Sequence, residues 1–261
     1  MKHLFFISAM LLLTASPSKA SDNSYILTSQ ERIATANFEE VRVRNAFNII
    51  LIPSNRNEVV LPENLRLPRG LEAKDIISVE RGTLTIGIPE SFRRRNTRIF
   101  GDTRQPDIRV YYTSLNALRL SGASSATSEG SISASAFQIG LSGASRANLD
   151  VVANSIVSGL SGSSNLTLIG IANEHTINAS GSSRVNAENV LETTNSTVSL
   201  SGSSGARIVA ENVRVGLSGS SNLTLNARDV RCSTSGSSRI RLNADAQRHI
   251  STSGSSSVRN L

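Results

Sequence analysis

The chain has 261 residues, a formal net charge of +7, 38% hydrophobic residues and a mean hydropathy of -0.10. These values lie in the globular range and exclude a chain that is disordered throughout. Aromatic residues make up only 4% and tryptophan is absent, so a core must be built mainly from Val, Ile, Leu and Ala, which favours thin layers of β-structure.

The first 20 residues have the pattern of a secretory signal peptide. Residues 1–3 are positively charged, residues 4–13 are apolar, and Ser18 and Ala20 are the small residues that signal peptidase requires. The apolar run of about ten residues is much shorter than the roughly 20 that span a bilayer, and no later stretch is apolar enough to do so. We therefore expect export, cleavage after Ala20, and a mature protein that does not span the membrane.

Removal of this segment takes away two lysines, so the formal net charge falls from +7 to +5. The remaining basic residues are spread over both halves of the chain. A nucleic-acid-binding protein would show a denser basic stripe with aromatic residues between the charges, so we expect no specific nucleic acid partner. The one dense group, Arg93, Arg94, Arg95 and Arg98, is either a solvated loop face or an anion-binding patch.

Residues 21–36 have mixed polarity and are predicted to be a flexible leader, and residues 37–119 a divergent N-terminal β region. Apolar residues alternate there around Val41, Ile49, Leu84 and Val110, and prolines separate the alternating stretches. Such a region could cover the end of a repeat array, where an open sheet edge would otherwise adhere to other chains.

The strongest signal is an internal repeat over residues 120–261. The motif Ser-Gly-Ala/Ser-Ser recurs at intervals of 17 to 21 residues, with its glycine at Gly122, Gly143, Gly162, Gly181, Gly202, Gly219, Gly236 and Gly254. Between the motifs, apolar and polar residues alternate strictly, as in Leu223, Leu225 and Ala227, with a phase slip before Val230 and Cys232. That alternation indicates strands with one buried face, and each slip indicates a corner.

A unit of this length is too short for a propeller blade and too poor in helix formers for a leucine-rich repeat. It fits one coil of a single-stranded parallel β-helix, an all-β solenoid with coils of 17 to 21 residues. We expect it to be right-handed, and to form one continuous domain with the preceding region over residues 37–261. Leu160, Leu200, Leu217, Leu223, Leu225, Val213 and Val215 are predicted to point inward.

The motif itself has a physical role in such a stack. Glycine above glycine lets neighbouring backbones approach at a tight corner or supplies a positive φ, and inward serines can bond to backbone groups of the bend. The same alternation buries Cys232, which cannot form an intramolecular disulfide because it is the only cysteine. An outward serine ladder that serves as a flat binding face is the functional alternative, and it is compatible with the structural one.

The strand at residues 82–86, the strand at residues 108–112 and the run of Leu-Ser-Gly-Ala/Ser-Ser repeats together resemble the bacterial family named putative autotransporter adhesin, head GIN domain (DUF2807-like). The resemblance covers about residues 38–261. It implies a parallel β-helix in a secreted, periplasmic or cell-surface protein of a Gram-negative bacterium.

Catalytic and metal-binding patterns are weak. After the signal peptide only His175 and His249 remain, and neither has a cysteine or a carboxylate pair at ligand spacing, so no metal, cofactor or catalytic residue is predicted. Glu188, Glu211 and Asp229 occupy similar places in their coils and could form a column along one edge, although we favour the alternative that they are solvated corner residues.

These observations leave three hypotheses for the function: a non-catalytic binding or adhesion module of the envelope, a structural or assembly component without a discrete ligand, and a polysaccharide-active enzyme. We favour the first of them. Acidic glycans, other envelope polymers or other envelope proteins are the partners it would have.

Overall fold

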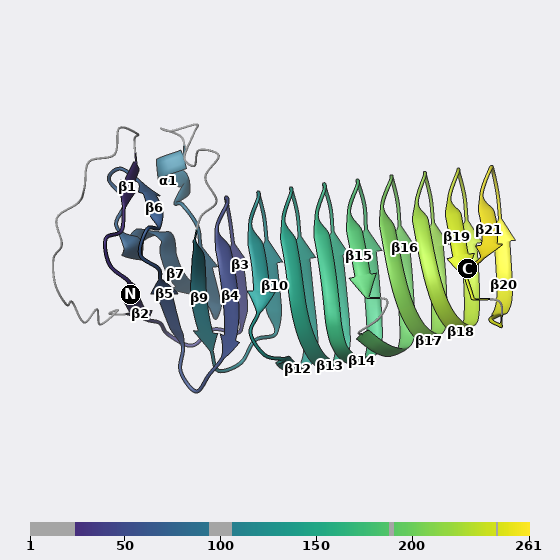
Figure 1. The fold of residues 1–261 in the computed structure, drawn as a ribbon, viewed down its shortest axis with the longest axis horizontal. Coiled ribbons are helices and arrows are strands. Elements are labelled where there is room, and N and C mark those ends of the chain that lie inside the picture. The colour runs from purple at the N-terminus through teal and green to yellow at the C-terminus, as the bar shows by residue number, and fades with distance from the viewer. Residues whose placement is uncertain (1–23, 94–105, 188–190, 244) are drawn as a thin grey trace.

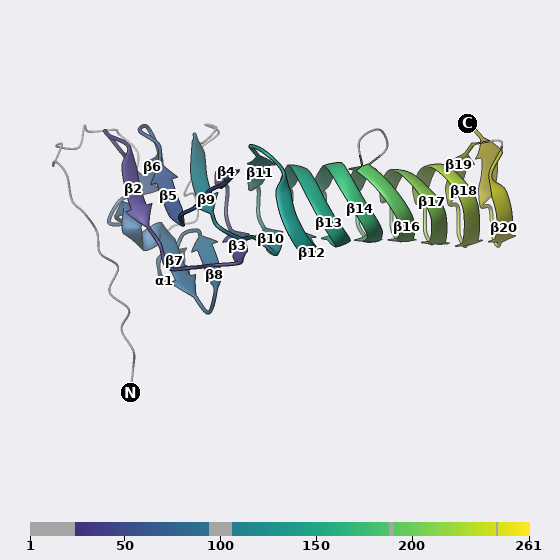
Figure 2. The same cartoon turned by 90° about the horizontal axis from the view of Figure 1, so that it is seen from below.

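The computed structural model describes residues 24–93, 106–187, 191–243 and 245–261. Nineteen of its 21 strands belong to one sheet, which is wound into a long solenoid of stacked coils with a more irregular body at the N-terminal end (Figures 1 and 2). The parallel β-solenoid predicted from the repeat is therefore confirmed.

The N-terminal end of the solenoid is covered by antiparallel strands. β5 (Glu58–Leu61) pairs with both β2 (Glu31–Ala34) and β9 (Asp107–Tyr112), β7 (Ile77–Glu80) pairs with β8 (Thr83–Ile86), and β1 (Ser24–Ile26) pairs with β6 (Arg66–Pro68). The 3-10 helix η1 (Ala73–Ile76) and the short helix α1 (Glu90–Arg93) lie in the connections. In this arrangement the antiparallel strands β7 and β5 cover the edges of β8 and β9 at the N-terminal end of the stack.

The sequence predicted a flexible leader over residues 21–36, and the structure differs. β1 and β2 lie in that range, Leu27 is buried in the core and Ile33 packs against it. The mixed polarity is the alternation of β2, in which half-buried and exposed residues follow one another.

The first coil of the solenoid contains no Ser-Gly motif. β3 (Glu40–Val43) and β4 (Asn48–Pro53) pair in parallel with β10 (Ala117–Leu120) and β11 (Ser125–Ser128) on one side, and with β8 and β9 on the other. After β4 the chain leaves the stack, builds the N-terminal body, and then passes this coil again to continue at β10. The parallel stack thus begins before residue 120.

The remaining strands follow one another coil by coil, all in parallel register (Figure 1). They are β12 (Ile132–Leu141), β13 (Arg146–Leu160), β14 (Asn165–Ala179), β15 (Arg184–Ala187), β16 (Leu191–Leu200), β17 (Gly205–Leu217), β18 (Asn222–Thr234), β19 (Arg239–Leu242), β20 (Gln247–Thr252) and β21 (Ser257–Asn260). The longest of them bend around a corner and pair with the next coil on both sides of it, with one unpaired position at the bend.

The Ser-Gly motifs form the tight turn of each coil and stack on one another. Every motif glycine has φ between +69° and +79°. A Cβ built on Gly219 would lie 2.7 Å from the carbonyl oxygen of Gly202 in the preceding coil, and the other motif glycines are equally crowded by the turn before them. Asn45, with φ +75°, takes this position in the first coil, where Gly122 stacks on its carbonyl. Glycine is therefore required for two reasons, its left-handed backbone and the close approach of the coils.

In seven of the eight motifs the last serine points inward and its hydroxyl bonds a carbonyl of the turn. The hydroxyl of Ser221 donates to the carbonyl of Ser218 at 2.7 Å, and the equivalent bond recurs in the other six coils from Ser124 to Ser238, at 2.7 to 3.0 Å. These serines are fully buried. Because water cannot reach the turn carbonyl there, the hydrogen bond from the hydroxyl satisfies an acceptor that would otherwise be unpaired.

The core is a stack of aliphatic rows. The residues predicted to point inward are all buried: Leu160, Leu200, Leu217, Leu223, Leu225, Val213 and Val215. Cys232 is buried as well, in register with Val215 of the preceding coil, which confirms its predicted orientation. Among the described residues, no helix has the length and apolarity to cross a membrane.

Candidate functional site

A row of mostly small, outward-facing residues runs along the solenoid just before the Ser-Gly turns. Each member is in register with the next coil, and we call these residues the floor row: Arg42, Arg119, Gly140, Gly159, Asn178, Ser199, Gly216, Ser233 and Ser251. From Gly159 to Ser233 this row lines a surface groove of about 670 Å³, with the first serines of the turns along one side.

A second row lies two residues earlier in each strand, and its members are exposed or half-buried except Ala117, which is buried. We call it the ridge row, and it consists of Glu40, Ala117, Gln138, Val157, Thr176, Thr197, Arg214, Arg231 and His249. A hollow of about 530 Å³ between Thr197 and His249 shares Ser199, Gly216 and Ser233 with the groove. The two hollows therefore form one surface, named here the axial groove.

The axial groove offers hydroxyl, amide and guanidinium groups. Its serines and Asn178 can donate and accept hydrogen bonds, while Arg214 and Arg231 only donate. Because equivalent positions repeat with each coil, this chemistry suits an extended ligand that follows the solenoid axis. The sequence alternative of a serine-lined binding face corresponds to the turn side of this groove.

The arginine group predicted from the sequence lies largely outside the described residues. Arg94, Arg95 and Arg98 fall in the range 94–105, and of Arg93 only the backbone, at the end of α1, is described. The predicted anion-binding patch at these four residues stays a prediction.

His175 does not form a dyad with Glu174. The two residues alternate, so Glu174 is exposed while the imidazole is buried and lies 2.9 Å from the hydroxyl of Ser158. Burial lowers the pKa of His175 to about 4. His249 is exposed on the ridge row of another coil, so the two histidines form no common site.

The carboxylate column considered from the sequence does not form. Asp229 is in register with Asn212 and not with Glu211, whose carboxylate instead lies 3.9 Å from Arg228. Glu188 lies outside the described residues. The two coils have the same spacing of 17 residues between their turn glycines, and Asp229 lies one position later in its coil than Glu211 does, so the two carboxylates are not in register. The part of the chain that the structure describes contains no group of three potential metal ligands.

Sequence reasoning missed the pairing of Arg214 with Arg231. The two residues are 17 positions apart, which is also the spacing of Gly202 and Gly219, and they are in register on adjacent strands. Writing the coils beneath one another by their glycines would have brought these arginines together.

A sequence profile described as "Putative auto-transporter adhesin, head GIN domain" matches residues 37–225. The chain belongs to this family. The match begins just before β3 and ends within β18, so it includes the motif-free first coil and Arg214, while Arg231 lies beyond it.

Solved structures share the fold of this GIN-domain chain. A putative adhesin from Parabacteroides merdae superposes with a TM-score of 0.77 at 14% identity, covering 89% of this chain and 95% of that one. A putative lipid binding protein from Parabacteroides distasonis gives a TM-score of 0.73 at 18% identity, with coverage of 92% and 98%. At these identities the likeness concerns the fold alone. A comparison with curated proteins finds no match.

Proposed function

We propose that this GIN-domain protein is an exported, non-catalytic binding module of the bacterial cell envelope or surface, and that the axial groove holds its ligand. The groove itself carries the proposal, because it crosses five coils from Gly159 to Ser233 and presents equivalent polar groups in each. A chain of repeating chemical units is the kind of ligand that can use such a surface.

The residues of the groove favour binding over catalysis. Among the residues that the structure describes, no groove serine is hydrogen-bonded to a histidine or a carboxylate of the kind that activates a nucleophile, although the exposed His249 lies in the same groove. The one described serine–histidine contact, between Ser158 and His175, is buried in the core and closed to substrates. Relatives named as adhesins also favour a binding role.

Export rests on the signal-peptide pattern of residues 1–20, and it agrees with membership of a family described as adhesins. In this location the available ligands are glycans, other envelope polymers and envelope proteins. A structural or assembly role without a discrete ligand is the second candidate, and it shares the same fold.

A variant at Gly216 tests the groove directly. Gly216 has no positive φ, and a Cβ built on it would meet no atom within 4 Å, so Gly216→Tyr fills the groove without straining the backbone. Residues 21–261, with and without this change, are to be applied to an array of neutral and acidic glycans, envelope polymers and phospholipid vesicles. We expect ligands retained by the native protein to be lost by Gly216→Tyr.

The matched control is Asn222→Tyr, which places the same ring on the exposed face after the turn. We expect this variant to bind as the native protein does. Native protein that retains nothing on the array would support the structural role instead, and equal retention by both tyrosine variants would move the ligand away from the axial groove.

A further inference from the structure

Two arginines of the ridge row lie one above the other. Arg214 and Arg231 are in register on the adjacent parallel strands β17 and β18, and both side chains are exposed. Neighbouring strands are about 4.8 Å apart, so two positive charges repeat at this interval. Within the described ranges neither guanidinium takes part in an ion pair or a hydrogen bond with another residue.

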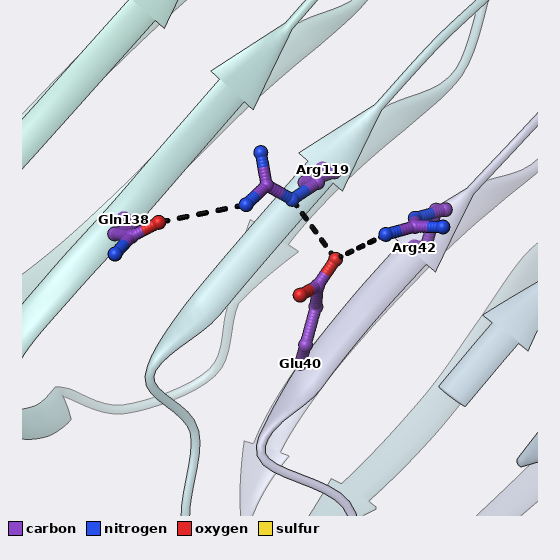
Figure 3. Close-up of polar contacts among 4 residues, drawn as sticks. All are labelled: Glu40, Arg42, Arg119 and Gln138. Carbon is purple, nitrogen blue, oxygen red and sulfur yellow. Dashed lines mark hydrogen bonds and ion pairs between the residues drawn. The ribbon is translucent and has the colours of Figure 1, made fainter. Parts of the chain in front are cut away.

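Another pair of stacked arginines differs from this one, because a carboxylate lies between its two side chains. Arg42 and Arg119 are in register in the floor row near the N-terminal end, and Glu40 lies between them (Figure 3). The carboxylate of Glu40 accepts a bond of 2.8 Å from Arg42 and one of 2.9 Å from Arg119. Glu40 thus compensates one of the two positive charges of that pair, whereas no described carboxylate pairs with Arg214 or Arg231.

The acidic residues nearest to Arg214 and Arg231 do not compensate the positive charge of these two side chains. Asp229 faces outward two residues before Arg231 but pairs with neither arginine, and Glu211 is 3.9 Å from Arg228. Residues 205–261 hold eight arginines and three acidic residues, while residues 121–204 hold two arginines and five acidic residues. The positive charge of the solenoid is therefore concentrated in its last coils, with His249 following Arg231 in the ridge row.

Like charges in neighbouring strands repel one another and cost stability. A surface that keeps them exposed beside a groove is suited to an anionic ligand, because each guanidinium can bond a carboxylate, sulfate or phosphate through two parallel N–H groups. We propose that the axial groove takes a linear acidic polysaccharide along the solenoid axis, with Arg214 and Arg231 bonding anionic groups on successive parts of the chain. This inference rests on the proposed function and names the ligand class of that groove.

Other polyanions fit the surface less well. Single-stranded nucleic acid binding uses aromatic side chains on which bases stack, and Phe137, the one aromatic residue in residues 121–261, is buried. A membrane surface would favour exposed apolar anchors, but Leu261 is the only large exposed hydrophobic side chain described in residues 205–261. The serine and glycine floor beside the arginines instead matches the hydroxyl groups of sugars.

The test compares polygalacturonate with its fully methyl-esterified form, which has the same sugar backbone without the charges. We expect residues 21–261 to bind polygalacturonate at low salt, to bind the ester more weakly, and to lose affinity as salt rises. Arg214→Gln with Arg231→Gln should lower the affinity for polygalacturonate by about tenfold, the size of loss expected from two exposed charge contacts.

The control is Arg239→Gln with Arg241→Gln, which removes the same charge from exposed positions on the other side of the turn. This variant should bind within about twofold of the native protein. Equal losses in both double variants, no loss in either, or tighter binding of duplex DNA or phosphatidylglycerol vesicles than of polygalacturonate would each overturn the inference.

The failure of this inference can be told from the failure of the proposed function. If neither polymer binds and Gly216→Tyr changes nothing, the proposed function fails. If the ester binds as well as polygalacturonate, only this inference fails.

Discussion

The hydroxyl of Ser158 lies 2.9 Å from Nε2 of His175, and both side chains are buried inside the solenoid. The imidazole occupies a row in which Phe137 and Ile156 precede it and Ser196 and Val213 follow it, so it stands among mostly apolar side chains. Nδ1 of His175 finds no hydrogen-bond partner among the described residues. A charged imidazole is therefore strongly disfavoured there.

The burial of the His175 imidazole predicts that the folded protein loses stability in mild acid. Burial lowers the pKa of His175 to about 4, while the unfolded chain titrates near pH 6.5, so the unfolded state binds more protons between these values. As the pH falls from about 6.5 to 4, the free energy of unfolding should drop by up to about 3 kcal/mol. Urea denaturation at pH 7.5 and pH 4.5 measures the drop.

The double variant Ser158→Ala with His175→Leu separates this effect from the titration of carboxylates. Replacing both partners by apolar groups leaves no unpaired polar atom, so stability at pH 7.5 should change little. Its loss between pH 7.5 and 4.5 should be smaller than that of the native protein. The same pH dependence in both proteins would rule out His175 as the source.

Replacing a turn glycine by alanine should cost much more stability than replacing a groove glycine. Gly219→Ala adds a Cβ 2.7 Å from the carbonyl oxygen of Gly202 at a φ of +69°, and we expect a loss of about 2 kcal/mol or more in the free energy of unfolding. Gly216→Ala, three residues earlier, meets open space at an ordinary φ and should be neutral or stabilising by about 0.5 kcal/mol. Chemical denaturation of the two variants decides, and similar losses would contradict the stacked-turn geometry.

The buried serine of the motif should contribute more to the free energy of unfolding than its exposed neighbour does. Ser221→Ala removes a 2.7 Å bond and leaves the carbonyl of Ser218 without this donor, so we expect a loss of about 1 kcal/mol. Ser220→Ala changes an exposed side chain and should stay within about 0.5 kcal/mol of the native protein. Thermal and urea denaturation of both variants test the difference, which would vanish if the hydroxyl had no structural role.

Cys232 should be chemically inert in the folded protein. Its side chain is buried, and burial raises the pKa of the thiol to about 11, so little thiolate forms at pH 8. We expect a charged thiol reagent to label it only when the protein is unfolded. Cys232→Val, which repeats the residue of the preceding coil, should cost less than about 1.5 kcal/mol. Rapid labelling of the native protein would contradict the inward orientation.

The repeat determined most of the architecture. Eight glycines at intervals of 17 to 21 residues, with strict alternation between them, predicted parallel coils and the inward residues, including Leu225 and Cys232. This was possible because each coil pairs mainly with its neighbours, so a local pattern is copied into the tertiary structure.

The tertiary structure decided two features that the repeat pattern does not mark, the turn residue of the first coil and the neighbours on the outer surface. Asn45 replaces the turn glycine of the first coil, since asparagine also tolerates a positive φ, and 77 residues separate it from Gly122, on which it stacks. The pairing of Arg214 with Arg231, and the absence of a pair between Glu211 and Asp229, depend on the register of β17 against β18, which is an offset of 17 residues along both strands. Inward residues follow from the local alternation within one coil, whereas neighbours on the outer surface follow from the register between coils, which the tertiary structure fixes residue by residue.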